Sequence, residues 1–134
     1  MTLATMGREG PWAAAVFYAH DGLALHFLSS PGSRHALDIG TGTEVAATIQ
    51  HDYDDWPGIR GLQLRGRAAP VTAGDQALVQ RRYGERFPIV GLPAKAPAAI
   101  VRALDRIRWY TLRPRSIWLI DNRLGFAHRE QLDL

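Results

Sequence analysis

The chain has 134 residues, a formal net charge of +3 and a hydrophobic fraction of 46%, and it contains no cysteine. This length and composition predict a single globular domain spanning residues 1–134. The absence of cysteine excludes disulfide frameworks, thiolate nucleophiles and cysteine-ligated zinc or iron–sulfur centres. No apolar run approaches the roughly 20 residues of a membrane span, and residues 1–10 do not resemble a signal peptide. We therefore expect a cytoplasmic protein that does not bind membranes.

Short β-rich runs bounded by Gly, Pro, Asp and Ser predict strands over the first two-thirds of the chain. The expected strands span residues 3–6, 12–19, 23–29, 44–50 and 59–71, with turns at 8–11 and 20–22. Between the third and fourth strands, two apolar residues three positions apart and the following Gly40 predict a short helix over 33–39. Glycines at 61 and 66 predict a bend or bulge in the long strand.

The last third of the chain is predicted to be partly helical. We expect a helix over 73–86 capped by Thr72, a loop over 89–96, a second helix over 97–106, one or two strands over 107–121 broken at Pro114, and a polar tail over 122–134. About six strands without regular βαβ alternation predict a small antiparallel barrel with helices on its rim. Such a barrel has too little interior for a cofactor cavity, so a large ligand is expected between subunits.

The basic residues do not predict a nucleic-acid surface. Lys95 is the only lysine, and arginines are spread along the chain from Arg8 to Arg129 instead of gathering in one segment. We therefore expect no nucleic-acid partner.

The stretch Phe-Leu-Ser-Ser-Pro-Gly-Ser-Arg-His over residues 27–35 carries the strongest chemical signal. A strand ends in hydroxyls, a Pro-Gly turn follows, and Ser33, Arg34 and His35 open a helix. Hydroxyl donors, backbone N–H groups and an arginine fork would converge there, which is an arrangement that holds a phosphate. The alternative is that Ser29, Ser30 and Ser33 are ordinary turn and cap residues beside a solvated Arg34.

Three other patterns carry weaker signals. The acidic loop over 51–56 fits no metal-ligand spacing, so we expect a solvated loop and no metal. The segment 118–129 is dense in aromatic and cationic residues, and it is interpreted either as a docked structural tail or as part of a site. No serine lies in a Gly-x-Ser-x-Gly elbow, so hydrolase chemistry is unsupported.

Several motifs occur in an order that matches one family. They are Gly10-Pro11-Trp12, Val16-Phe17-Tyr18-Ala19, Phe27-Leu28-Ser29, Ser33-Arg34-His35-Ala36, the run Gly-Leu-Gln-Leu-Arg-Gly over 61–66, Tyr83 with Arg86-Phe87-Pro88, and Trp118 to Arg129. In this the chain resembles the pyridoxamine 5'-phosphate oxidase-like, FMN-binding split-barrel proteins, and especially their small uncharacterised branch. The resemblance implies a mainly β (α+β) fold, a six-stranded antiparallel split β-barrel with short flanking helices. It also implies a homodimer with FMN at the subunit interface and flavin-dependent oxidoreductase activity on an unknown small molecule.

The resemblance further implies which residues contact FMN. Arg34 and His35, with Ser29, Ser33 and the backbone at Leu28, would hold the phosphate; Val16, Phe17 and Tyr18 would offer backbone groups to the isoalloxazine edge; Gln63 would reach the flavin; Trp118 with His128 or Arg129 would come from the second subunit. The catalytic residues are not identified by the resemblance.

The chain departs from the oxidase at two positions. Ala14 and Ala19 stand where the oxidase strand has Arg and Lys, both of them cofactor ligands, so two cationic contacts are missing. The substrate-binding residues of the oxidase are not recognisable either, so pyridoxal phosphate synthesis is not expected. Two further interpretations stay open: the same fold with heme or a deazaflavin, which relatives of this fold also use, or a cofactor-free dimeric module without catalysis.

Overall fold

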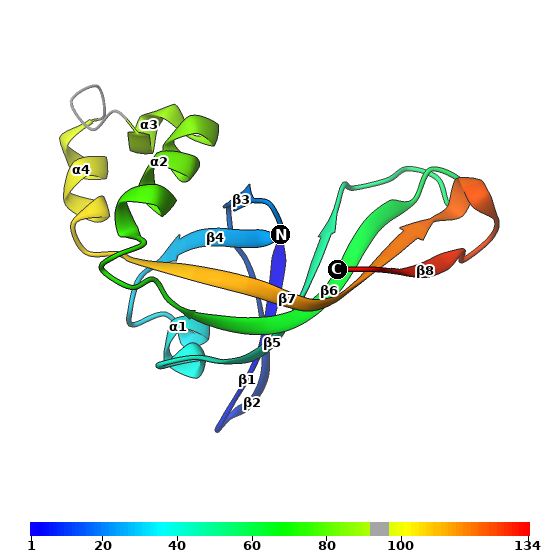
Figure 1. The fold of residues 1–134 in the computed structure, drawn as a ribbon, viewed down its shortest axis with the longest axis horizontal. Helices are drawn as coiled ribbons and strands as arrows, with labels where there is room; N and C mark the ends of the chain where they lie inside the picture. Colours follow the sequence, from blue (N-terminus) through cyan, green and yellow to red (C-terminus); the bar gives the residue numbers. More distant parts are fainter. Residues whose placement is uncertain (92–96) are drawn as a thin grey trace.

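The computed structural model describes residues 1–91 and 97–134. Its centre is one antiparallel sheet in the strand order β2-β1-β5-β6-β7-β4-β3, with β8 beside β7 (Figure 1). The strands are β1 (Thr2–Gly7), β2 (Gly10–Ala15), β3 (Tyr18–Asp21), β4 (Ala24–Ser29), β5 (Thr43–Gln50), β6 (Arg60–Pro70), β7 (Arg108–Asp121) and β8 (Arg129–Leu132). The helices are α1 (Arg34–Ile39), α2 (Gln76–Arg86), α3 (Pro88–Gly91), α4 (Ala98–Leu104) and the 3-10 turn η2 (Asn122–Leu124). The predicted mainly β fold with short flanking helices is confirmed.

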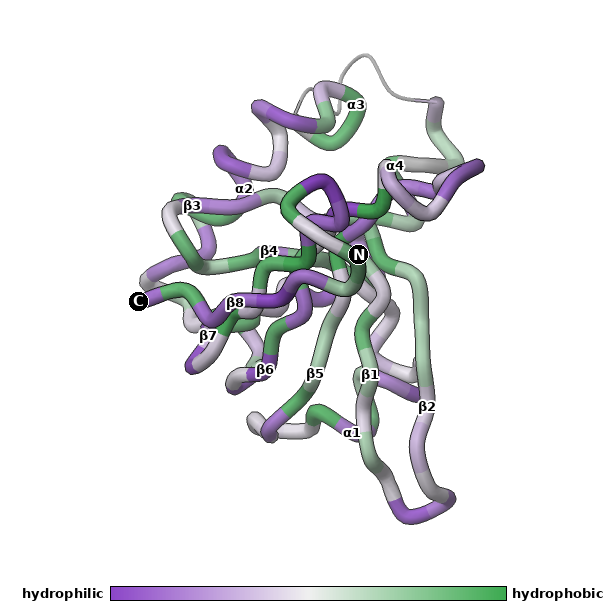
Figure 2. Tube along the Cα trace, turned by 90° about the vertical axis from the view of Figure 1, so that its right-hand side faces the viewer, coloured by the Kyte–Doolittle hydropathy of each residue, from purple (hydrophilic) through white to green (hydrophobic). Residues whose placement is uncertain are grey.

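Eight strands are present where six were predicted, because two segments change partner or join the sheet. The predicted strand 12–19 is two strands: β2 pairs with β1, whereas β3 pairs with β4, and the chain crosses between them at Val16 and Phe17. The predicted polar tail 122–134 contains β8, which pairs with β7 from Ile117 to Ile120. A strand that is polar on most of its positions carries little local signal (Figure 2).

Pro114 does not break β7, which was the second wrong prediction. Arg65 pairs with Ser116 and Gly66 with Pro114, so Arg115 is an extra, bulged residue next to Pro114, and β7 continues to Asp121. A Cβ atom on Gly66 would lie 2.1 Å from the backbone oxygen of Arg113, so only glycine allows the strands to approach this closely. The irregularity predicted for the strand 59–71 therefore occurs at Gly66, but the bulged residue belongs to the facing strand β7.

Two helix predictions need correction at their starts and ends. The helix predicted over 73–86 begins at Gln76, because the Thr72 hydroxyl donates to the Asp75 carboxylate and does not cap a helix. Part of the predicted loop 89–96 is the short helix α3, and residues 92–96 lie outside the described residues. The helices predicted over 33–39 and 97–106 appear as α1 and α4 within one or two residues of the expected limits.

The core lies where the sheet is covered by α1 on one side and by α2 near the β3–β4 hairpin. Leu3, Phe27, Ala68 and Leu112 have no exposed surface, and the rings of Phe27 and Tyr110 stack with centroids 5.4 Å apart. Beyond this core, β6, β7 and β8 extend with the 51–59 loop as an arm, on the far side of the molecule from α2, α3 and α4 (Figure 1). Among the described residues no helix has the length and apolar character of a membrane span.

Candidate functional site

Three of the predicted phosphate contacts form one cluster, which we call the hydroxyl–imidazole cluster: Ser29, Ser33 and His35. The Ser29 hydroxyl lies 2.9 Å from the Ser33 hydroxyl and 2.6 Å from Nε2 of His35, and the Ser33 hydroxyl lies 3.2 Å from the same nitrogen. Ser29 ends β4 and His35 lies in the first turn of α1, so the tight turn between them, closed by the Ser33 N–H donating to the Ser30 carbonyl, brings the side chains together.

Burial controls the protonation of the cluster. His35 is buried, and its pKa is lowered because desolvation penalises the imidazolium, an effect that the nearby Asp38 carboxylate opposes. A neutral imidazole has one N–H donor and one acceptor nitrogen, and each hydroxyl can donate or accept. The cluster can therefore reorganise its hydrogens toward a bound anion without a fixed charge of its own.

The Arg34 guanidinium points toward the β1–β2 hairpin. Its Nη1 lies 2.5 Å from Oε2 of Glu9, its Nη2 donates to the Gly10 carbonyl at 3.4 Å, and its Nε lies 3.6 Å from Oδ1 of Asp38. The Trp12 ring lies beneath it, 5.6 Å from Cζ. The contact of Arg34 with a phosphate stays a prediction, and it requires the guanidinium to leave Glu9.

The backbone expected at the isoalloxazine edge is partly engaged already. The Val16 N–H donates to the Met1 carbonyl at 2.9 Å, and the Met1 amine donates to the Val16 carbonyl at 3.0 Å. Tyr18 and Leu28 take part in strand pairing, while the Phe17 side chain is 77% exposed. Of these positions Phe17 lies between strands, so its backbone is outside the sheet ladder.

A second group of predicted residues meets on the arm. Gln63 lies directly opposite Trp118 in the β6–β7 pair, and the Arg129 guanidinium lies 4.8 Å from the centre of the Trp118 ring. They line a groove of about 350 Å³, which we call the arm groove; its walls are Gln63, Leu64, Arg65, Ser116, Trp118, Arg129 and Gln131. The strands β6, β7 and β8 thus each supply one predicted site residue to this groove.

The arm groove contains residues that the sequence prediction missed. Arg65 donates from Nε to the Ser116 hydroxyl at 3.3 Å and adds a second guanidinium. The sequence already indicated Arg65, because Gln63 and Arg65 are two positions apart on one strand and therefore share a face. Gln131 had no such signal, since its place depends on the pairing of β8.

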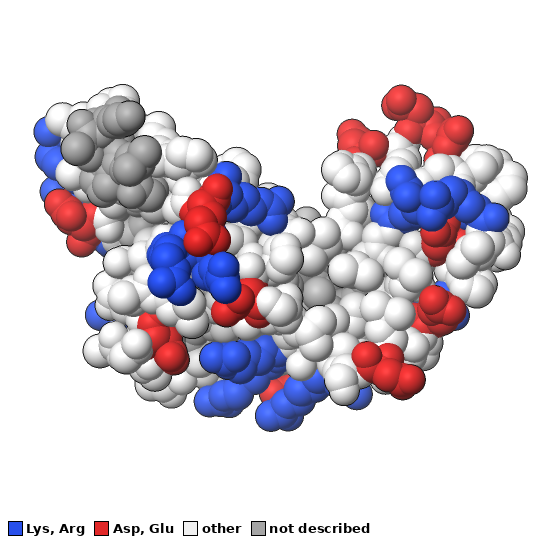
Figure 3. All heavy atoms as spheres, turned by 45° about the horizontal axis from the view of Figure 1, so that its top comes forward, with Lys and Arg blue, Asp and Glu red and all other residues white. Residues whose placement is uncertain are grey.

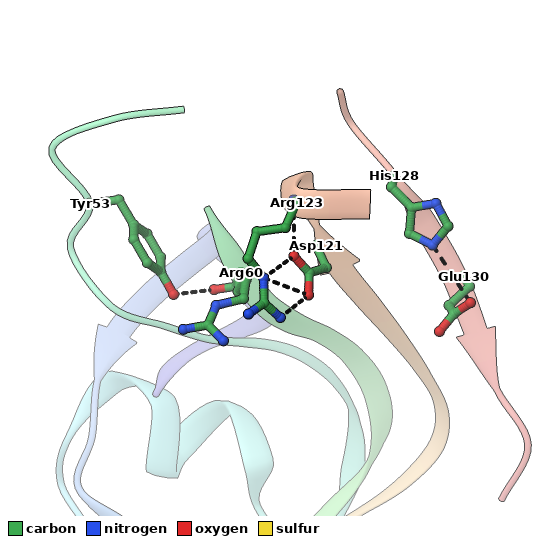
Figure 4. Close-up of polar contacts among 6 residues, drawn as sticks. All are labelled: Tyr53, Arg60, Asp121, Arg123, His128 and Glu130. Carbon is green, nitrogen blue, oxygen red and sulfur yellow. Dashed lines mark hydrogen bonds and ion pairs between the residues drawn. The ribbon is translucent and has the colours of Figure 1, made fainter. Parts of the chain in front are cut away.

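The tip of the arm is held by a separate set of polar contacts (Figure 4). Arg123 donates from Nε to Asp121 Oδ1 at 2.9 Å and from Nη2 to Oδ2 at 2.5 Å, and this side-chain hydrogen bonding lowers the pKa of Asp121 to about 2. The Tyr53 hydroxyl donates to the Arg60 carbonyl at 2.7 Å. His128 lies outside the arm groove, with Nε2 3.6 Å from Oε2 of Glu130.

The hydroxyl–imidazole cluster and the arm groove lie at opposite ends of β7. Ser29 pairs with Arg108, the first residue of β7, and Trp118 follows ten residues further along the strand. At about 3.3 Å per residue the two sites are roughly 33 Å apart along the strand. The two groups of predicted site residues therefore lie in different parts of one chain.

The chain is similar in sequence to proteins of enteric bacteria. It is 32% identical over 120 residues to the UPF0306 protein of Enterobacter sp. strain 638, with 88% of this chain and 76% of the relative covered. It is 30% identical over 120 residues to the UPF0306 protein of Klebsiella pneumoniae strain 342, with 88% and 74% covered. No protein-family model matches the chain.

Solved structures with the same fold include proteins of different described function. A heme-binding protein from Mycobacterium smegmatis superposes with a TM-score of 0.70 at 20% identity, over 98% of this chain and 51% of that one, so the chain spans about half its length. HutZ, the heme storage protein of Vibrio cholerae, gives 0.68 at 20% identity, over 87% and 82%. A putative pyridoxamine 5'-phosphate oxidase from Listeria innocua gives 0.59 at 19% identity, over 87% and 83%. These similarities show the split-barrel fold.

Proposed function

Because the chain belongs to the UPF0306 family and has a split-barrel fold, we propose that it is an FMN-binding homodimer that oxidises or reduces a small molecule. The observation that carries the proposal is the meeting of Gln63, Trp118 and Arg129 in the arm groove. An indole presents a face on which a flat ring can stack, and a carboxamide and a guanidinium supply hydrogen bonds for the polar edge of the ring.

The hydroxyl–imidazole cluster fits the phosphate end of FMN. Ser29, Ser33 and His35 offer two hydroxyls and a ring nitrogen within 3.2 Å of one another. The cationic ligands absent at Ala14 and Ala19 are not replaced by this neutral cluster, so we expect phosphate binding through hydrogen bonds and an affinity below that of the oxidase. Bound FMN supplies hydride or electron transfer, whereas the chain binds it, orients it and shields it from water.

The proposed site combines two subunits. Because the cluster and the arm groove of one chain are roughly 33 Å apart along β7, we propose that the cluster of one subunit and the arm groove of its partner bind the same FMN. Each dimer then has two equivalent sites, and a monomer has none that is complete.

The phosphate assignment is tested by comparing FMN with riboflavin in the His35→Ala variant. Loss of one hydrogen bond to a charged group predicts about 10- to 100-fold weaker FMN binding, with riboflavin binding unchanged. His20→Ala, in the exposed β3–β4 hairpin, is the matched control and should bind both like the wild type. Equal losses for the two ligands in His35→Ala would contradict the assignment.

Subunit mixing tests whether the site is shared. A heterodimer of one His35→Ala chain and one Trp118→Ala chain, isolated through two different affinity tags, has one intact shared site and one doubly damaged site. We expect it to bind one FMN per dimer with wild-type affinity. If the site lies within one chain, both sites of the heterodimer are damaged and no wild-type affinity remains.

Heme binding is the second candidate, because the described functions of the Mycobacterium smegmatis and Vibrio cholerae proteins involve heme. The visible spectrum of the purified protein separates the candidates. Flavin absorption bands support the proposal, a Soret band favours heme, and a protein that binds neither after reconstitution is a cofactor-free module.

A further inference from the structure

A cleft between α2 and the arm is distinct from the two sites described above. It encloses about 520 Å³, within the usual range for small-molecule sites. Figure 3 shows the surface hollowed between the helices and the arm, with basic side chains on both sides. We call it the central cleft; it is lined by Met1, Tyr18, Ile49, Gln50, His51, Tyr53, Arg60, Gly61, Leu62, Arg86 and Leu119.

The central cleft has two arginines and no carboxylate in its lining. Arg86 comes from the last turn of α2 and Arg60 from the start of β6. Over the described residues neither guanidinium makes an ion pair, because nearby carboxylates are taken by other arginines. Arg82 pairs with Asp21 at 3.2 Å and with Glu85 at 3.4 Å, and Arg123 bonds to both oxygens of Asp121. The cleft therefore concentrates positive potential, which favours an anion.

Neighbouring groups orient the Arg86 side chain and hold the backbone at Arg60. The Arg86 guanidinium lies 4.5 Å from the centre of the Tyr18 ring and 5.5 Å from that of Phe87, which leaves the N–H edge of its planar fork for a ligand. Tyr53 donates to the Arg60 carbonyl and so anchors the 51–59 loop beside Arg60 (Figure 4). A guanidinium fork matches the oxygen spacing of carboxylates and phosphates.

The remaining wall of the central cleft combines an apolar part with the polar residues Gln50 and His51. Ile49, Leu62 and Leu119 line it together with the two tyrosine rings. A ligand with one anionic head group and an apolar or aromatic body would use both the two arginines and the apolar part of this lining.

We propose that the central cleft binds a small organic anion, a carboxylate or a phosphate ester with an apolar body, whose head group pairs with Arg86 and Arg60. That this anion is the substrate rests on the proposed function, because Tyr18 lines the cleft and its backbone is expected at the flavin edge. The binding of the anion does not depend on FMN.

The test is a calorimetric titration of the full chain without FMN, using phenyl phosphate, benzoate and the neutral benzyl alcohol. We expect millimolar or tighter binding of at least one anion, and about tenfold weaker binding in Arg86→Gln and in Arg60→Gln. Arg115→Gln, which removes an exposed ion pair with Glu44, is the control and should bind like the wild type. Comparing phenyl phosphate with benzoate shows which head group the cleft prefers.

Several results would overturn the assignment. They are no binding of either anion, equal binding of benzyl alcohol, unchanged binding in both Arg86→Gln and Arg60→Gln, or loss of anion binding in His35→Ala, which would place the ligand in the hydroxyl–imidazole cluster. Visible absorption of FMN-loaded protein is measured separately on the same variants. A chain that binds the anions but no flavin refutes the proposed function and leaves the cleft assignment standing.

Discussion

The two ends of β7 differ in the contacts that keep them in place. Near Arg108, the strand lies beside β4 and the hydroxyl–imidazole cluster is supported by buried side chains of β4 and α1, including Phe27 and Ile39. Near Trp118, the strand lies in the arm, where Trp56 and Phe126 at the tip remain 57% and 79% exposed although their rings meet at 5.5 Å. One half of the proposed site is thus preorganised by the core, whereas the other is held by strand pairing and by contacts between surface residues.

This difference indicates which half depends on a partner. Packing in a dense core leaves side chains few alternatives, so the cluster keeps its geometry in a single chain. The arm has many exposed apolar groups and little core behind it, which is typical of a segment that packs against another surface. We therefore expect changes in the arm to alter cofactor binding more than folding.

The largest effect is expected where the two ends join, at Gly66, which faces the bulge in β7. Gly66→Ala places a Cβ atom 2.1 Å from the Arg113 oxygen, so β6 and β7 must separate, and the free energy of unfolding should fall by about 3 kcal/mol or more. Urea denaturation of the wild type and the variant measures this change in the free energy of unfolding. Gly74→Ala is the control, because its nearest contact is 3.9 Å away and its stability should hardly change. A loss in Gly66→Ala no larger than in the control would show that the strands separate easily here.

Removal of residues 122–134 should affect only the arm end. The deletion removes β8 and Arg129, and with them a cation–π contact and one wall of the arm groove, so FMN binding should weaken about tenfold or more. Hydrogen exchange should show lost protection at 117–120 and unchanged protection in β4. If the shortened chain does not fold, the arm belongs to the core and the contrast between the ends is wrong.

The loss of stability in acid should come from histidines at the end of β7 that packs in the core. Burial lowers the pKa of His26 and of His35 below 6.5, so each is neutral in the folded state while the unfolded chain binds protons more readily. The contribution of these two histidines to the free energy of unfolding should therefore be lost as pH drops below 6.5. His26→Gln should reduce the slope of the free energy of unfolding against pH below 6.5. An unchanged slope in His26→Gln would contradict the assignment.

The smallest effect is expected at the arm tip. Arg123→Gln removes the hydrogen bonds that hold the pKa of Asp121 at about 2, so this pKa should rise toward 3.8. Because the lowered pKa stabilises the folded state above pH 3.8, and this is lost as pH falls toward 2, only the acid limb of the stability curve should change. Carboxyl NMR titration measures this pKa, and a value that stays near 2 would mean that the backbone N–H of residue 123 and Arg60 suffice to lower it.

The sequence by itself determined the elements whose signals are local. The hairpin at Gly22 and the end of α1 at Gly40 follow from glycines with φ of 57° and 53°, a conformation that other residues rarely adopt. The turn from Ser29 to His35 placed three phosphate candidates within six residues of one another, so their meeting needed only a turn and one helical turn. Such features depend on neighbours in the chain, which a sequence pattern displays directly.

The tertiary structure decided the features that depend on distant partners. Arg34 pairs with Glu9, which lies 25 residues away in the β1–β2 hairpin and which the local sequence around Arg34 does not indicate. β8 has a polar sequence and is a strand only because β7 offers it an edge. The two arginines of the central cleft come from α2 and β6, and nothing in either segment indicates that they share a cleft. Charge pairing and strand pairing are set by which surfaces folding brings together, and that information is distributed over the whole chain.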